Sequence, residues 1–189
     1  MNSIKNFLFE VKGYKVKKMK VEENLKDLLK LCEECLDYYK LIGIKSVNLD
    51  TAKEVFEELP PGKEDESKMV IGVYNNKDTL IGIIEGIRDF PKKDIWYIGQ
   101  MMISKNYRNR GLGEKFYKGF EELALMNNVN SINLGVLKDN IKGLRFWNKM
   151  GFVVIERIEN YKIGNIETTV FRMENSIIKN MDKYPKSVK

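Results

Sequence analysis

Hydrophobic and polar positions alternate along the chain with two different periods, which predict a mixture of helices and strands. Apolar side chains recur every three or four residues from Glu22 to Tyr39, as expected for an amphipathic helix. A strand is predicted before it, from Tyr14 to Val21, and a second short helix after it, from Thr51 to Leu59. The pair Pro60-Pro61 ends that helix, because proline lacks the backbone donor that a helix needs.

The second half of the chain continues this alternation. The runs KMVIGVY and TLIGIIEGI flank the polar turn 75–78 and predict a β-hairpin. The elements predicted after it are a strand IWYIGQMMI, a helix from Leu112 to Met126, a strand SINLGV, a helix through Lys149 that Gly151 ends, and two strands, FVVIERI and ETTVFRM. We therefore expect one α/β domain over residues 1–173 and a polar, unstructured tail over 174–189.

The amino-acid composition excludes several classes of function but does not identify the function. The chain of 189 residues has a net charge of +6, and because its lysines are spread along the sequence, we expect this charge to lie on the solvated surface. The chain also lacks the aromatic-basic motif of a specific nucleic-acid binder. Histidine is absent, so catalytic triads and imidazole zinc sites are excluded, and no metal is expected. Cys32 and Cys35 fall within a helical pattern and are expected to be small buried side chains.

The apolar runs also bear on where the protein resides. None of them approaches the roughly 20 residues of a membrane helix. The first ten residues lack the hydrophobic region and cleavage site of a secretory signal. The expectation is a cytoplasmic protein without membrane association, either a monomer or a homodimer.

A basic, glycine-containing loop joins a strand to a helix at residues 107–116, YRNRGLGEKF. Backbone amides and a helix N-terminus converge at such a junction, and this geometry binds pyrophosphate. The loop is not a dinucleotide fingerprint, because Phe116 stands where the third glycine would be, and it is not a P-loop, because Glu114 follows Gly113. Taken alone, it could also be a tight turn with surface arginines.

A second motif downstream makes the loop more specific. Residues 108–113, R-N-R-G-L-G, match the R/Q-x-x-G-x-G/A signature of the GNAT superfamily of acetyl-CoA-dependent N-acyltransferases. The run NIKGLRFWNKMGFVV resembles that superfamily's second signature, at the separation the family shows. The resemblance runs from about Tyr14 to Met173. Within the superfamily, the chain is similar to small bacterial acetyltransferases whose substrates are mostly unassigned.

The resemblance implies a fold and a cofactor site. It implies a twisted mixed sheet of about seven strands, with helices on both faces and acetyl-CoA held between two splayed strands, 95–103 and 131–136. Gly99 is a plausible bulge in the first of these. The residues expected to contact acetyl-CoA are Met101, Met102, Ile103, Arg108, Asn109, Arg110, Gly111, Leu112, Gly113, Asn140, Phe146 and Trp147.

The implied reaction is direct attack of an amine on the bound thioester, and a base or a chain of water molecules must remove the amine proton. Glu85 is the candidate, because it lies among isoleucines in a predicted strand and burial there would raise its pKa; the alternative is a simple ion pair with a neighbouring lysine or arginine. Asp89 and Gln100 are weaker candidates for base and substrate orienter. Trp147 occupies the position where the family often has a tyrosine that acts as the general acid.

The sequence leaves the substrate and the extent of turnover open. The leading hypothesis is N-acetylation of a primary amine on a small molecule or peptide. The alternative is an acyl-CoA-binding regulatory domain with little or no turnover, which the replacement of tyrosine by Trp147 would allow. Tyr38, Tyr39 and Tyr97 could line a substrate pocket, although aromatics beside helical leucines are more often core.

Overall fold

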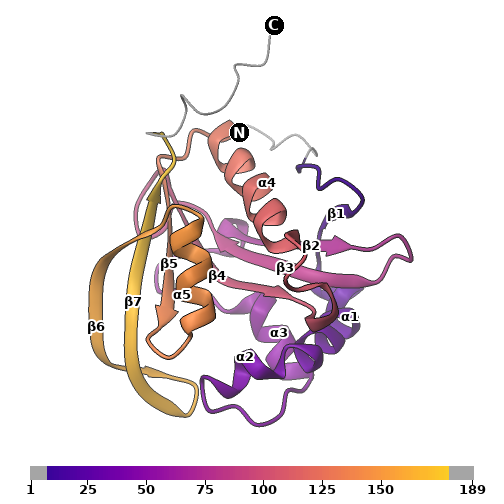
Figure 1. The fold of residues 1–189 in the computed structure, drawn as a ribbon, viewed down its shortest axis with the longest axis horizontal. Coiled ribbons are helices and arrows are strands. Elements are labelled where there is room, and N and C mark those ends of the chain that lie inside the picture. Colours follow the sequence, from indigo (N-terminus) through magenta and orange to yellow (C-terminus); the bar gives the residue numbers. More distant parts are fainter. Residues whose placement is uncertain (1–7, 179–189) are drawn as a thin grey trace, which may run out of the picture.

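A computed structural model describes residues 8–178 and shows a seven-stranded sheet with helices on both faces (Figure 1). The strands are β1 (Lys15–Lys18), β2 (Lys68–Tyr74), β3 (Leu80–Ile87), β4 (Ile95–Ile103), β5 (Ser131–Leu137), β6 (Val153–Ile163) and β7 (Ile166–Ser176). The helices are α1 (Val21–Glu34), α2 (Leu36–Lys40), α3 (Leu49–Glu57), α4 (Leu112–Met126) and α5 (Ile141–Lys149), with short 3-10 turns at Asp65–Ser67 and Lys105–Tyr107.

The order of the strands in the sheet is β1-β2-β3-β4-β5-β7-β6. All neighbouring strands are antiparallel except β4 and β5, which are parallel and joined through α4. The predicted hairpin is formed by β2 and β3, and a second, long hairpin by β6 and β7, which curves along one side of the molecule (Figure 1). The mixed sheet predicted from the resemblance is therefore confirmed.

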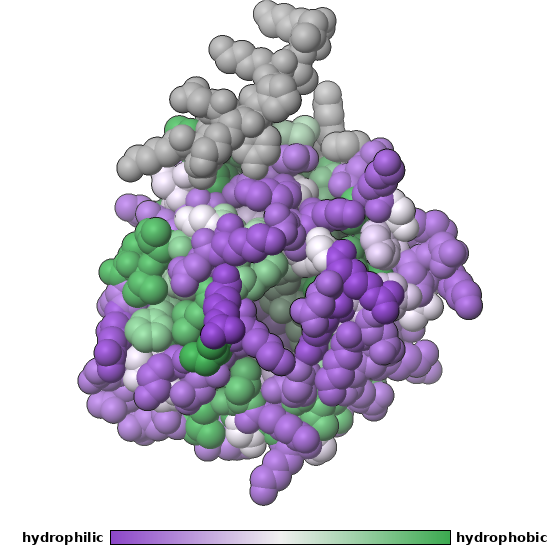
Figure 2. Space-filling view, viewed as in Figure 1, coloured by the Kyte–Doolittle hydropathy of each residue, from purple (hydrophilic) through white to green (hydrophobic). Residues whose placement is uncertain are grey.

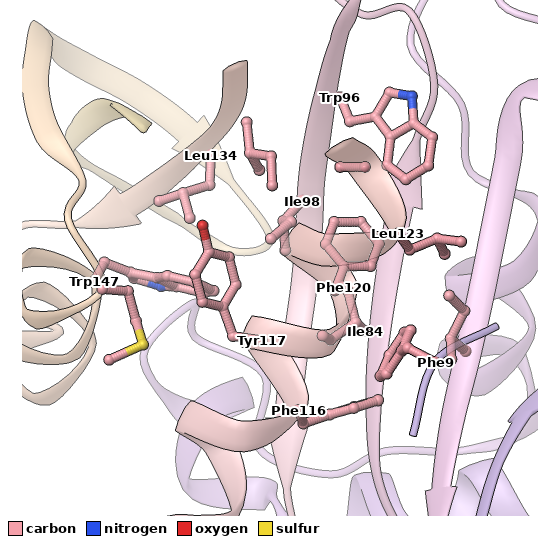
Figure 3. Close-up of a cluster of buried hydrophobic side chains, with 14 of the residues drawn as sticks. Phe9, Ile84, Trp96, Ile98, Phe116, Tyr117, Phe120, Leu123, Leu134 and Trp147 are labelled. Atoms are coloured by element: carbon pink, nitrogen blue, oxygen red, sulfur yellow. The ribbon is translucent and has the colours of Figure 1, made fainter. Parts of the chain in front are cut away.

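Two hydrophobic clusters, one on each face of the sheet, hold the helices in place. On one face α4 inserts Phe116, Tyr117 and Phe120 against the strands, and these side chains are fully buried. Figure 3 shows this aromatic layer, with Trp147 from α5 beside Tyr117. On the other face α1 to α3 pack through residues such as Leu28 against β2 and β3.

Several boundaries differ from those predicted: α3, for example, runs from Leu49 to Glu57 rather than from Thr51 to Leu59. The helix expected from Glu22 to Tyr39 is divided at Cys35, whose ψ of 20° lies outside the helical range, and the first strand ends at Lys18. At the other end, β7 continues through Ser176, and Asn175 and Ile177 are buried. The boundary placed after Met173 is thus too early; the remaining tail, 179–189, lies outside the described residues. Within residues 8–178, no helix is both long and apolar enough to cross a membrane.

Candidate active site

The sheet opens between β4 and β5. Ile95 to Ile98 pair with Ser131 to Leu134, and no pairing between the two strands continues beyond these residues. On its other side β4 remains paired with β3, except that Gly99 is an extra residue between the partners of Glu85 and Gly86. The predicted splay and the predicted bulge at Gly99 are both confirmed. The consequence is a strand, 99–103, with one backbone edge facing open space.

A cleft of about 1110 Å³ occupies this opening. Figure 2 shows a hollow near the centre of that face, with hydrophobic surface inside and hydrophilic side chains around it. Ten of the twelve residues predicted to contact the cofactor line the cleft: Met101, Met102, Ile103, Arg108, Asn109, Gly111, Gly113, Asn140, Phe146 and Trp147. The other two do not line it, since Arg110 is exposed outside the cleft and Leu112 is 2% exposed in the core.

The loop before α4 has the backbone geometry of an anion site. Asn109 and Gly111 adopt left-handed conformations, with φ of 59° and 76°, and Gly111 is the N-cap of α4. The first amide of the helix with an intrahelical acceptor is that of Lys115, bonded to the Gly111 oxygen at 3.1 Å. The amides of residues 112–114 are therefore available at the positive end of the helix dipole, as an anion requires.

The two motifs meet across the cleft. A Cβ on Gly113 would lie 3.5 Å from the Phe146 ring, so the start of α4 lies close against the second half of α5. Asn140 caps α5, accepting from the Gly143 amide at 2.9 Å. A Cβ at position 143 would lie 2.5 Å from Asn140 Nδ2, so glycine lets the Asn140 side chain lie close against the start of the helix. Asn140 is thus ordered at the cleft wall with its Nδ2 group unused by the cap.

Arg108 uses its side chain differently from what a phosphate ligand would require. Its guanidinium makes a bidentate ion pair with Asp37 of α2, at 2.5 and 3.1 Å, and its Nε donates to the Ile103 carbonyl at 2.7 Å. The Arg108 guanidinium lowers the pKa of the Asp37 carboxyl. The Arg108 side chain therefore connects α2 to the end of β4. At this first position of the motif, the backbone rather than the side chain is offered to the cleft.

Glu85 is buried directly behind the bulge. It is 5% exposed, its carboxylate packs against Gly99 closely enough to exclude a Cβ there, and Lys68 Nζ lies 2.9 Å from Oε1. Burial raises the Glu85 pKa, and the ion pair with Lys68 opposes that rise without cancelling it. Glu85 does not itself line the cleft. Glu85 thus has both of the predicted features, since it is buried among isoleucines and paired with a lysine. Its role as the base stays a prediction.

The other predicted polar candidates separate clearly in the structure. Tyr38 and Tyr97 line the cleft, and burial raises the pKa of each to about 12. Tyr39 does not line it; its hydroxyl donates to Cys32 Sγ at 3.2 Å and accepts from Gln100 at 3.3 Å. Asp89 is in the turn after β3, where it accepts from the Asp94 amide. The tyrosines, rather than Asp89, are placed to contact a substrate.

Among the cleft residues that were not predicted from the sequence are Asp37, which pairs with Arg108, and Phe90, Tyr161 and Arg172. Phe90 packs edge-on against Tyr97, with ring centroids 5.5 Å apart. Tyr161 and Arg172 belong to the β6–β7 hairpin. The alternation of its sequence predicts on which face of the sheet each side chain lies, but not which other elements that face contacts. Only the tertiary arrangement brings them to the cleft.

Trp147 is mainly a packing residue. It is 8% exposed and meets Phe146, Tyr117 and Phe152 at centroid distances of 4.8, 5.4 and 5.1 Å. Three edge-on or near edge-on aromatic contacts fix the indole between α4 and α5. The indole also lines the cleft, and this packed position favours a contribution of shape rather than of a proton.

Comparison with known proteins places this geometry in a family. Residues 46–152 match the Acetyltransferase (GNAT) family, and the chain belongs to it. Solved structures of similar fold include spermidine N-acetyltransferase from Vibrio cholerae in complex with CoA and spermine, at TM-score 0.70 and 16% identity, covering 89% of this chain and 98% of that one. Ard1 from Thermoplasma volcanium matches at TM-score 0.64 and 20% identity, covering 87% and 97%. At these identities the structural likeness shows the fold alone.

Proposed function

We propose that the protein is an N-acetyltransferase that transfers an acetyl group from acetyl-CoA to a primary amine of a small molecule or peptide. The observation that carries this proposal is the placement of both family motifs on one cleft, at the point where β4 and β5 separate. The cleft of about 1110 Å³ slightly exceeds the roughly 300–1,000 Å³ typical of single small-molecule sites, as a large cosubstrate such as acetyl-CoA requires.

The residues present fit acetyl-CoA as a cosubstrate. The free amides of residues 112–114 suit its pyrophosphate, and Lys142 adds positive charge to the same wall, whereas Lys149 is paired with Glu114. The unpaired edge of β4 from Gly99 to Ile103 offers backbone donors and acceptors to an extended, amide-containing arm. Acetyl-CoA supplies the activated acyl group. No metal is part of the proposal.

The protein's contribution to the reaction is positioning and proton removal. Holding an amine and a thioester in contact can supply about 7–11 kcal/mol of the barrier, and one backbone N–H directed at the developing oxyanion about 3 kcal/mol. An attacking amine must lose a proton, and Glu85 is the buried carboxylate beside the bulge. Because Glu85 lies behind the cleft wall, that proton has to pass beside Tyr38 or Tyr97, whose side chains both experience its charge.

Release of free CoA, measured with acetyl-CoA and a panel of primary amines, tests the proposal. We expect amine-dependent release above the rate of hydrolysis, and an acetylated amine detectable by mass spectrometry. Acetyl-CoA binding without release for any amine would favour the alternative of a binding domain. Absence of acetyl-CoA binding would reject both.

A further inference from the structure

The end of the cleft away from the phosphate loop has a composition of its own. We call it the acceptor end and define it by Tyr38, Phe90, Tyr97, Tyr161 and Arg172. Aliphatic side chains complete its walls: Leu41, Ile158, Ile163 and Val170. A ligand here would meet mostly aromatic and aliphatic surface and one guanidinium group.

Negative charge on the wall of the cleft is already neutralised or distant from this end. The carboxylates that line the cleft among the described residues are Asp37, Glu114 and Asp139. Asp37 is held by both terminal nitrogens of Arg108, and Glu114 by Lys149 at 2.6 Å. Asp139 lies next to Asn140 at the start of α5. A polyamine, which needs several separate carboxylates, is therefore poorly matched to this wall.

The strand register places the acceptor-end charges on one face of the sheet. Tyr97 pairs with Ile87, so it shares a face with Glu85, two residues before Ile87 on the same strand. In the other direction Tyr97 pairs with Asn133, two residues before Gly135, and Gly135 pairs with Arg172. Directly opposed residues share a face. One face therefore carries Glu85 on β3, Tyr97 on β4 and Arg172 on β7, in that order across the sheet.

Gly135 keeps the space between Tyr97 and Arg172 open. A Cβ on Gly135 would lie 3.1 Å from the Tyr97 hydroxyl, so this hydroxyl reaches over β5 toward the β7 side. The charges of Arg172 and Glu85 both act on the Tyr97 hydroxyl, with opposite effects on its pKa. Tyr97 thus lies between a buried anion and a partly exposed cation.

The guanidinium of Arg172 has N–H donors that its ion pair does not use. Its one ion pair among the described residues joins Nη1 to Glu156 at 2.5 Å, and the two side chains are 36% and 49% exposed. Ion pairs at that exposure are weak, and a guanidinium has five N–H donors. A ligand carboxylate could bind the remaining donors in the bidentate manner that arginine favours.

On these grounds, and resting on the proposed acetyltransferase function, we propose that the acceptor is a zwitterion: an amino acid with an aromatic or branched apolar side chain. Its carboxylate binds Arg172, its side chain packs among Tyr38, Phe90 and Tyr161, and its amino group faces the bulge in front of Glu85. In the transfer, the amine nitrogen forms a bond to the acetyl carbon, the carbon–sulfur bond breaks, CoA leaves as the thiolate, and the amine proton passes to the protein or solvent.

Paired substrates that differ only in the carboxylate test this assignment. The probes are L-phenylalanine against phenethylamine and L-leucine against isoamylamine, with spermidine as the polyamine, each assayed for kcat/KM by CoA release. We expect the amino acid to exceed its decarboxylated partner by about tenfold or more, the usual effect of a charged hydrogen-bonded contact. Arg172→Gln should collapse this ratio toward one, and Arg172→Lys should keep part of it.

Arg157→Gln is the matched control, since Arg157 is on the same hairpin, pairs with Glu159 at 3.0 Å and does not line the cleft. It should leave the ratio as in the wild type. The assignment is overturned if spermidine or a decarboxylated amine is preferred, or if Arg172→Gln and Arg157→Gln give the same ratio. If acetyl-CoA binds but no probe is acetylated, the acceptor class is wrong and the cofactor assignment stands. If acetyl-CoA does not bind, the proposed function itself fails.

Discussion

Replacement of Gly113 by alanine, compared with the same change at Gly111, tests what the fold and the cofactor each need from this loop. A Cβ at this position would meet the Phe146 ring at 3.5 Å and Met101 Cε at 3.7 Å, which are ordinary contacts. Alanine is favoured over glycine in a helix by roughly 0.5–1 kcal/mol. For a chain of this size such a gain raises Tm by about 1–4 °C. The folded protein should thus tolerate the change or benefit from it.

Cofactor binding should change little with alanine at position 113, because the signature R/Q-x-x-G-x-G/A that this loop matches admits alanine there. At Gly111, where the signature has glycine alone and φ is 76°, alanine strains the loop, and a pyrophosphate lying against the amides at the start of α4 would lose at least one charged hydrogen bond. Such a bond contributes about 1.5–3 kcal/mol, so the dissociation constant of Gly111→Ala for CoA should rise about 10- to 150-fold. Thermal denaturation and calorimetric titration with CoA measure the two effects independently.

Gly111→Ala is the contrasting variant. Nothing lies within 4 Å of a Cβ there, but its φ of 76° is strained for alanine, so Tm should fall, by an amount that corresponds to about 1–2 kcal/mol, together with CoA affinity. A Gly111→Ala protein that binds CoA as tightly as the wild type would show that the cofactor does not pass close to this loop. That result would refute the reasoning even if the protein were active.

Three further variants test separate parts of the site. Glu85→Gln should lower kcat about 10²- to 10⁴-fold and remove the acidic limb of the pH–rate profile. Because a base works only when deprotonated and burial raises the Glu85 pKa, that limb should lie at a higher pH than for an ordinary glutamate; an unchanged kcat would assign the proton elsewhere. Trp147→Tyr should lower CoA affinity or Tm, by an amount corresponding to about 1 kcal/mol of lost contact, without raising kcat. A several-fold faster enzyme with unchanged affinity would contradict the packing role. Asp37→Asn frees Arg108 and removes a negative charge from the cleft, so CoA should bind about two- to fivefold more tightly at low salt, less so at high salt. Weaker binding would instead mean that the ion pair supports the loop.

The elements that could be predicted from the sequence are those whose signals are local. Helix α4 was predicted with its observed bounds because its apolar period and the glycines before it are contiguous in the chain. The hairpin of β2 and β3 follows from two apolar runs around a polar turn. The end of β7 was missed because Asn175 is polar, yet it is buried and donates to Tyr117 and Glu121, which are more than 50 residues away. Hydrogen bonds to such distant residues, which make the burial of a polar side chain possible, leave no local pattern in the sequence.

The same distinction holds within the site. The phosphate loop is a contiguous motif, and so its position and glycines could be predicted. The bulge at Gly99 could be predicted only through the family resemblance, and its physical cause, the Glu85 carboxylate packed against it, is a contact between two strands. Arg172 and Tyr161 look like exposed strand residues in the sequence. Their place in the cleft depends on the curvature of the β6–β7 hairpin, which sequence alternation does not encode (Figure 1).

Calorimetric titration of the purified protein with acetyl-CoA tests the central claim most directly, because every later step depends on this cosubstrate entering the cleft between β4 and β5. The account predicts saturable binding of one acetyl-CoA per chain, with a dissociation constant below the millimolar range, and a matching rise in Tm when the ligand is present. No heat and no shift in Tm at millimolar acetyl-CoA would contradict it.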